Sequence, residues 1–97
     1  MKKEHINGLL SDFEGVKTKK LLSHGNFNVT LISIEKGTEL PTHVADSDAV
    51  VLVVEGKVIF TIEGKEHELG LNDMYEFSKD VPHSLKALEN SKILLTK

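Results

Sequence analysis

The hydrophobic positions of this chain fall in short runs that are rich in β-branched residues and are separated by glycine, asparagine or aspartate. In the run 58–62, the side chains at 58, 60 and 62 share one face, which is the two-residue period of a strand. Such runs predict strands at 16–23, 27–34, 49–54, 58–62, 66–69, 74–77, 83–88 and 92–96. Only residues 7–13 have a pattern that fits a helix, and it is short. The pattern therefore predicts an all-β fold of roughly eight or nine strands.

The turns between these runs recur at a regular spacing. The tripeptide Glu-Gly-Lys stands at 55–57 and again, eight residues later, at 63–65, each time between two β-rich runs. Short strands with glycine turns at this spacing are typical of a β-sandwich or barrel. The chain has no linker or low-complexity stretch, so we expect one domain over residues 1–97, with an N-terminal arm at 1–19 and a barrel at 20–97.

The segment 49–54 is apolar on both faces, whereas a strand with one solvated face alternates. If Ala49, Val51 and Val53 point inward, the side chains between them point outward and need cover. These outward side chains are those of Val50, Leu52 and Val54. A loop that shields a central strand is one explanation. We favour a homodimer interface on this outer face, because exposed apolar patches of that size are uncommon on monomers.

Five histidines are the candidates for metal or acid–base chemistry, namely His5, His24, His43, His67 and His83. We expect His5 in the arm, His24 in a turn and His67 on a charged strand to be solvated. His43 and His83 differ, because each closely follows a proline and opens a β run. Rigid extended backbone of this kind aims a side chain into the mouth of a barrel.

Residues 37–56 resemble the first motif of the cupin family, G-x5-H-x-H-x3-E-x6-G. Gly37, His43 and Gly56 are in register over all twenty positions, whereas Ala45 and Ala49 stand where the motif has its second histidine and its glutamate. The resemblance covers about residues 20–97. It implies a small single-domain RmlC-like cupin, whose fold is a double-stranded β-helix, or jelly-roll barrel.

The second cupin motif, G-x5-P-x-G-x2-H-x3-N, keeps only its histidine, His83. Its other fixed positions hold Asn72, Ser78, Asp80 and Ala87. Asparagine and aspartate tolerate positive φ better than other non-glycine residues. We therefore expect Asn72 and Asp80 to make the turns that the family makes with glycine.

In cupins, three histidines and a glutamate hold a divalent metal, and the resemblance carries this role over to His43 and His83 alone. Alanine at 45 and 49 offers no donor atom, and two imidazoles are fewer ligands than protein metal sites usually supply. Asp46 and Asp48 are close in sequence, but we expect them in a solvated turn. The degenerate motif thus predicts no cofactor, and a divalent metal at His43 and His83 is the alternative.

The two alanines also leave room around the histidines. If the parity of the motif holds, the barrel interior forms an apolar ligand pocket with two polar points. Its predicted lining is His43, Ala45, Ala49, Val51, Phe60, His83 and Leu85, with Ile62 as an alternative to Phe60. Otherwise the cavity is packed shut, with the histidines bonded to each other or to backbone. Tyr75, the only tyrosine, is a candidate catalytic acid beside the histidines, as in sugar epimerases of the superfamily.

Composition narrows the class of function. Lys and Arg number 12 against 15 Asp and Glu, and the net charge of −3 argues against a sequence-independent hold on nucleic acid. The longest apolar run, 49–54, is too short for a membrane helix, and no apolar stretch follows the basic N-terminus as in a signal peptide. The absence of cysteine excludes disulfides and thiol nucleophiles. We expect a cytoplasmic protein.

These observations together predict a non-catalytic domain that binds or senses a small molecule as a homodimer, without nucleic-acid or membrane partners. The alternative is a metal-dependent cupin enzyme, of the dioxygenase or isomerase type, that uses His43 and His83. A third hypothesis is an interaction module that acts through the outer face of the 49–54 strand. The fold does not decide among them, because cupins host many unrelated chemistries.

Overall fold

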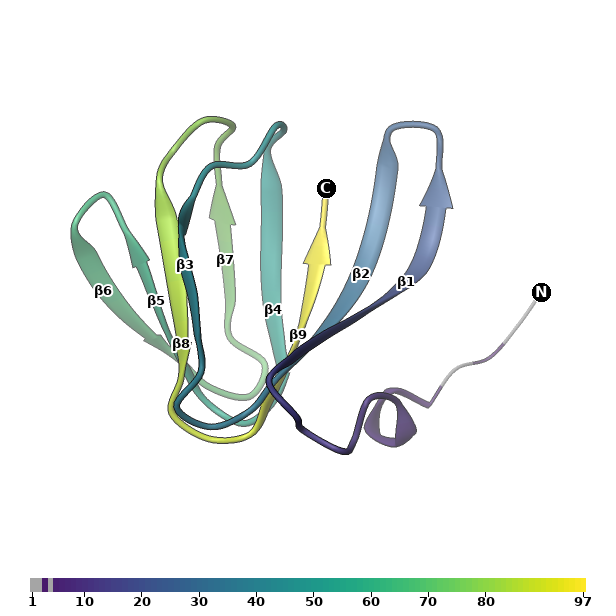
Figure 1. The fold of residues 1–97 in the computed structure, drawn as a ribbon. Helices are drawn as coiled ribbons and strands as arrows, with labels where there is room; N and C mark the ends of the chain where they lie inside the picture. Colours follow the sequence, from purple (N-terminus) through teal and green to yellow (C-terminus); the bar gives the residue numbers. More distant parts are fainter. Residues whose placement is uncertain (1–2, 4) are drawn as a thin grey trace.

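The computed structural model describes residue 3 and residues 5–97, and nearly all of its regular structure is strand (Figure 1). The strands are β1 (Val16–His24), β2 (Phe27–Ile34), β3 (Glu39–His43), β4 (Ala49–Glu55), β5 (Val58–Ile62), β6 (Lys65–Leu69), β7 (Met74–Phe77), β8 (His83–Ala87) and β9 (Ser91–Thr96). Among the described residues, the one helical element is the 3-10 helix η1 (Ile6–Gly8). Every strand predicted from the hydrophobic pattern is present, so the all-β prediction is confirmed.

The strands form two antiparallel sheets that face each other. The five-stranded sheet has the order β1-β2-β9-β4-β7, and the four-stranded sheet has the order β3-β8-β5-β6. In Figure 1 the four-stranded sheet lies on the left, and the β1–β2 hairpin extends the other sheet to the right. Strands distant in sequence, such as β2 and β9, are direct neighbours. This crossed antiparallel order is that of a jelly roll.

The core lies between the two sheets and follows the alternation of the strands. On β4, Ala49, Val51 and Val53 are buried and the residues between them are half-buried, so the predicted parity of this strand is confirmed. Phe60, in the middle of β5, is 1% exposed, and its ring lies 5.3 Å from the ring of Phe77 on the opposite sheet. Burial of apolar area stabilises the packing of the two sheets by about 25 cal/mol per Å², and Phe60 contributes to it as one of the largest buried side chains.

Strand β3 is the one that the hydrophobic pattern did not indicate. Its residues are mostly exposed, and it contains Pro41, which cannot donate to a ladder. The strand forms because it is at the edge of its sheet, where it pairs only with β8. The register shifts between Leu40 and His43, and His43 then lies opposite His83. The edge strand thereby brings the histidines of the two motifs together.

The turns expected from the two motifs have the positive φ that they require. Gly37 and Gly56 have φ values of 86° and 82°. Asn72 and Asp80 have φ values of 72° and 67°, so both replace a motif glycine as predicted. These are the two residue types for which a short polar side chain makes the left-handed region accessible.

The N-terminal arm does not form the helix that the pattern allowed at 7–13. Only Ile6–Gly8 make a 3-10 turn, and β1 already begins at Val16, within the segment expected to be arm. Leu10 and Phe13 have positive φ, 52° and 43°, which no right-handed helix accommodates. The arm is therefore an irregular segment that needs external contacts to hold its conformation.

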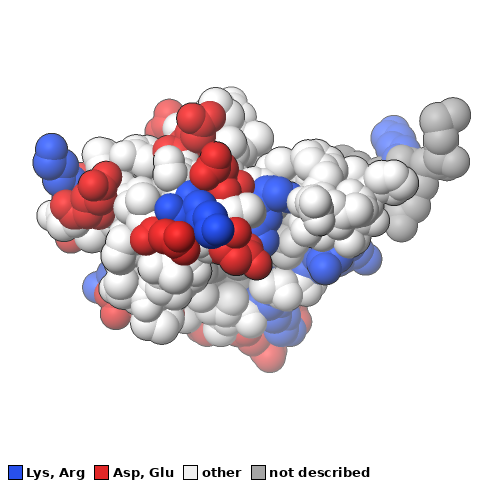
Figure 2. Space-filling view, turned by 90° about the horizontal axis from the view of Figure 1, so that it is seen from above, with Lys and Arg blue, Asp and Glu red and all other residues white. Residues whose placement is uncertain are grey.

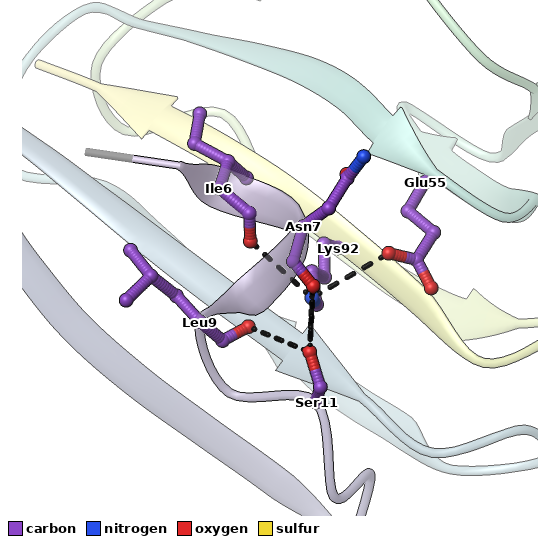
Figure 3. A network of polar contacts seen from close by, with 6 residues as sticks. All are labelled: Ile6, Asn7, Leu9, Ser11, Glu55 and Lys92. Carbon is purple, nitrogen blue, oxygen red and sulfur yellow. Dashed lines mark hydrogen bonds and ion pairs between the residues drawn. The ribbon is translucent and has the colours of Figure 1, made fainter. Parts of the chain in front are cut away.

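A buried lysine supplies those contacts (Figure 3). Lys92 lies on β9 and is fully buried. Its ammonium donates hydrogen bonds to the carbonyl oxygens of Ile6 and Asn7, at 3.3 and 3.1 Å. It also donates to the hydroxyl of Ser11, at 2.9 Å, and Glu55 Oε1 lies 3.5 Å away. The arm thus covers this cation on the face of the sheet and supplies hydrogen-bond acceptors in addition to the Glu55 carboxylate.

A second ion pair joins the arm to β1 at the surface. Lys17 donates a hydrogen bond to Asp12, and this bond lowers the pKa of the Asp12 carboxyl and raises that of Lys17. The carboxyl therefore supports docking of the arm above its ordinary pKa, and this support is lost as the pH falls through the lowered value. Because the pair is solvated, its contribution is small.

Candidate functional site

His43 and His83 meet at the end of the barrel, where β3 ends and β8 begins. Their ring centroids are 4.3 Å apart and their planes are inclined by 60°. His83 is only 6% exposed and its ring packs 4.5 Å from the ring of Phe77, whereas His43 is exposed. One imidazole thus belongs to the wall of the barrel and the other to its rim.

Backbone carbonyls fix the tautomer of both rings. Nδ1 of His43 lies 2.8 Å from the carbonyl oxygen of Pro41, and Nδ1 of His83 lies 2.9 Å from that of Val81. A carbonyl oxygen only accepts, so each Nδ1 carries a proton and donates it. In the neutral rings, each Nε2 is then an acceptor. The site presents two hydrogen-bond acceptors of the same kind side by side.

Nε2 of His83 is accessible from outside even though the residue is buried. It has no hydrogen-bond partner among the described residues. In that same part of the chain, the one polar side-chain atom that is both sealed from solvent and without a partner is Ser33 Oγ, far from the histidines on another strand. The lone pair of His83 is therefore open to a ligand at the mouth.

Below the histidines the barrel is nearly filled. A cavity of about 40 Å³ remains, and its lining is Ile32, Leu40, His43, Val51, Phe60, Phe77, His83, Leu85, Ile93 and Leu95. Five of the seven pocket residues expected from the sequence are among them, while Ala45 and Ala49 lie in the packed core. One water molecule occupies about 30 Å³ of the liquid. The space below the histidines is therefore far smaller than the roughly 300–1,000 Å³ that usually holds a small molecule.

The donor atoms at the mouth do not fit the four-ligand metal site of cupins. Ala45 and Ala49 are both buried and bring no donor. Asp46 is exposed, and the carboxylate of Asp48 accepts the backbone N–H of Lys79 at 2.9 Å, so both are turn residues as expected. Over residue 3 and residues 5–97, no group of three or more His, Asp or Glu side chains is placed to hold a metal ion.

Tyr75 does not join the two histidines as a third polar group. Its ring packs 5.2 Å from the ring of Phe60, and its hydroxyl lies 3.5 Å from Nε2 of His67. That distance is beyond the usual range of a hydrogen bond to nitrogen. The ring of Phe60 packs near both Tyr75 and His83, and among the described residues no hydrogen bond joins the Tyr75 hydroxyl to the histidine pair.

The burial of His67 differs from what we expected from the sequence. We expected it to be solvated on a charged strand, but it is half-buried and lies opposite Phe60 in the register of β5 and β6. The burial of His67 could have been predicted from the alternation of β6, because His67 shares a face with buried Leu69. The exposed lysine and glutamates on either side of His67 made the whole strand look solvated in the sequence.

The rim of the barrel mouth carries charges of both signs. Figure 2 looks down on this end of the molecule and shows acidic and basic side chains close together. Asp46, in the loop that follows β3, forms an ion pair with Lys97 at 3.3 Å. A rim of mixed sign produces no single-signed field that would draw in a charged ligand.

Another hollow of the surface, larger than the cavity below the histidines, includes neither His43 nor His83. It measures about 590 Å³ and is an open, polar groove beside the β1–β2 hairpin, lined by Lys20, Gly25, Asn26, Asn28, Thr30, Asp46, Ser47 and Lys97. None of the predicted site residues belongs to it. The site is therefore defined by the chemistry of the two imidazoles and not by the size of a hollow.

Comparison with known proteins agrees with this architecture. The family described as "Cupin domain" matches residues 30–96, which is more than half of the chain. The chain belongs to the cupin family. A cupin-2 domain-containing protein from Shewanella frigidimarina is 25% identical, with a TM-score of 0.81 over 97% of this chain and 92% of that one. No curated protein matches.

Two further solved structures resemble this cupin at similar levels. A conserved protein of unknown function from Streptococcus pyogenes is 25% identical, with a TM-score of 0.77 over 84% of this chain and 71% of that one. A cupin 2 conserved barrel domain protein from Leptotrichia buccalis is 29% identical, with a TM-score of 0.78 over 84% of this chain and 39% of that one. Within the described part of the cupin, no helix is long and apolar enough to span a membrane.

Proposed function

We propose that this cupin is a non-catalytic binding or sensing domain whose ligand is a small uncharged molecule with hydrogen-bond donors. The observation that carries the proposal is the pair of imidazoles at the mouth, each with its proton on Nδ1 and its lone pair on Nε2. Two neighbouring acceptors suit a ligand that presents hydroxyl or amide N–H groups. The mixed charge of the rim supports an uncharged ligand.

The size of the cavity limits how this ligand sits. Small-molecule pockets usually measure about 300–1,000 Å³, whereas the space below the histidines is about 40 Å³. The ligand therefore sits mainly at the mouth, and only a small apolar group of it enters between the aromatic rings of the wall. Its polar atoms stay at the rim, where His43 is exposed.

The arrangement favours binding over catalysis. Proton transfer needs an acid and a base within hydrogen-bond reach of the same reacting group. The two imidazoles are both acceptors, and the hydroxyl of Tyr75 faces His67 instead of the mouth. We therefore assign no catalytic residue.

A second candidate is a metal-dependent cupin enzyme that uses His43 and His83. One observation favours it, because histidines that bind metals usually donate their other ring N–H to a carbonyl or carboxylate, as both do here. This candidate needs ligands from water or substrate at the remaining coordination positions. The metal content of the protein distinguishes it from our proposal.

The binding proposal predicts which molecules perturb the histidines. In NMR spectra of protein with 15N-labelled histidine, n-butanol and butyramide are expected to shift the Nε2 signals of His43 and His83, and butyrate and butylammonium are not. His43→Ala is expected to weaken binding of the uncharged probes about fivefold, because one hydrogen bond of about 1 kcal/mol is lost. His24→Ala, at another exposed histidine, serves as the control. Uncharged probes that leave both Nε2 signals unchanged contradict the proposal.

A further inference from the structure

The polar groove beside the β1–β2 hairpin is built on the inner face of the five-stranded sheet, the face that carries the core. On β2 this face is apolar at Ile34 and Ile32 and then polar at Thr30 and Asn28, because side chains two residues apart share a face. Lys20 on β1 lies opposite Thr30 and shares its face. The hairpin extends beyond the four-stranded sheet, so this part of the inner face is open (Figure 1).

Two further segments line the groove. Lys97 follows β9 and exchanges two backbone hydrogen bonds with Asn28, at 2.6 and 2.9 Å. Asp46 and Ser47 belong to the loop between β3 and β4. The hairpin, this loop and the end of β9 lie at the same end of the molecule (Figure 1). Three parts of the sequence thus converge on a hollow of about 590 Å³, a volume within the range of about 300–1,000 Å³ that is usual for small-molecule sites.

Most polar side chains of the groove have no partner within the part of the chain that the structure describes. Asp46 and Lys97 pair with each other at 3.3 Å. The other polar side chains of the lining form no hydrogen bond or ion pair with a described residue, and these are Lys20, Asn26, Asn28, Thr30 and Ser47. Their donors and acceptors are therefore free to contact a ligand.

The charges of the lining determine which ligand suits the groove. Since Asp46 neutralises Lys97, Lys20 is the one charged group of the lining without a counter-ion among residue 3 and residues 5–97. A single ammonium balances a single carboxylate, while amide and hydroxyl side chains pair with hydroxyl groups as donors and as acceptors. A multiply charged anion would bring excess negative charge to a protein whose net charge is −3.

We propose that the groove binds a small polyhydroxy carboxylate, with its carboxylate on Lys20 and its hydroxyl groups along Asn28, Thr30 and Ser47. The hydrogen bond from the ammonium to the carboxylate is charge-assisted and therefore stronger than one between neutral groups. The groove shares no lining residue with the cavity below the histidines. This site is separate from the ligand site at the mouth, and either can fail its test without the other.

Three probes with the same six-carbon polyol chain test the charge of the ligand. D-gluconate, D-glucitol and D-glucamine carry a carboxylate, a hydroxyl and an ammonium at the end of this chain. In NMR titrations of the 15N-labelled full chain at constant ionic strength, gluconate is expected to shift the backbone amides of Asn28, Thr30 and Ser47 with a Kd of about 1 mM. Glucitol is expected to bind about tenfold more weakly, and glucamine more weakly still.

Neighbouring lysines on opposite faces of β1 provide a matched pair of variants. Lys20→Gln is expected to weaken gluconate about tenfold and to leave glucitol unchanged, because one charge-assisted hydrogen bond is lost. Lys19→Gln removes an exposed charge from the other face of the strand and is expected to change neither. Asp46→Asn frees Lys97 for the ligand and is expected to tighten gluconate about threefold.

The titrations separate the outcomes. Preferred binding of gluconate that Lys20→Gln weakens, Lys19→Gln preserves and Asp46→Asn strengthens supports the proposal. Equal shifts by the three probes, no shift up to about 50 mM gluconate, or equal weakening by the two lysine variants overturns it. Gluconate that shifts only the Nε2 signals of His43 and His83 overturns it as well, since the ligand is then at the mouth. Circular dichroism verifies that each variant is folded.

Discussion

Gly56→Ala is expected to lower the free energy of unfolding by about 3 kcal/mol or more. Gly56 has a φ of 82°, where an alanine is strained. A Cβ atom there would lie 2.4 Å from the carbonyl oxygen of Asn90 and 2.8 Å from Cα of Ser91. Both are backbone atoms where the chain enters β9, so the alanine cannot be accommodated by moving one flexible side chain. The strain of the backbone and the overlap therefore add.

The second Glu-Gly-Lys tripeptide supplies the control for this prediction. Gly64 has nearly the same φ, 76°, but a Cβ at this position meets nothing within 4 Å. Gly64→Ala is therefore expected to cost only the strain of the backbone, about 1 kcal/mol. Urea denaturation of both variants measures the difference. Equal losses at 56 and 64 would show that the close approach of the β9 turn to Gly56 is not real.

Lys92→Met is expected to have the second-largest effect, a loss of about 2 kcal/mol in the free energy of unfolding with release of the arm. Methionine fills a similar volume but donates no hydrogen bond. The carbonyl oxygens of Ile6 and Asn7 would then be left without the ammonium unless the arm lifts into water. Glu55 is 38% exposed and is hydrated when the lysine is lost, which keeps the cost below that of a fully buried pair.

Hydrogen exchange distinguishes release of the arm from a general loss of stability. In Lys92→Met, backbone amides of residues 5–15 are expected to exchange faster, while those of β4 and β5 keep their protection relative to the global stability. Lys86→Met, at an exposed position of β8, is the matched control and is expected to change neither quantity. Unchanged protection of the arm in Lys92→Met would contradict the role given to the buried ammonium.

Most of the fold could be predicted from the sequence because strand alternation and turn chemistry are local. The parity of β4 followed from its place in the first cupin motif, and positive φ at Asn72 and Asp80 followed from their place in the second motif and their residue type. β3 was missed because an edge strand with a proline and exposed side chains has no local signal. Docking of the arm on Lys92 was also missed, since residues 81 to 86 positions apart meet only in the folded chain.

The identity of the two site histidines could be predicted from the sequence, but their geometry and the size of the cavity could not. The motif spacing located His43 and His83, and the register of β3 and β8 is what places them opposite each other. Their tautomers depend on carbonyl oxygens two residues earlier in the chain, which only the folded backbone positions. The volume left by Ala45 and Ala49 could not be read from residue size. Neighbouring core side chains pack around both alanines, so the space did not become a pocket.

The central claim is that His43 and His83 act as hydrogen-bond acceptors for an uncharged ligand and do not hold a metal. Elemental mass spectrometry of the untagged protein tests this claim most directly. We expect metal well below about 0.1 atom per chain, because two imidazoles without a third protein ligand hold divalent ions weakly. Metal near one atom per chain that disappears in His43→Ala or His83→Ala would contradict it and favour the metal-dependent enzyme.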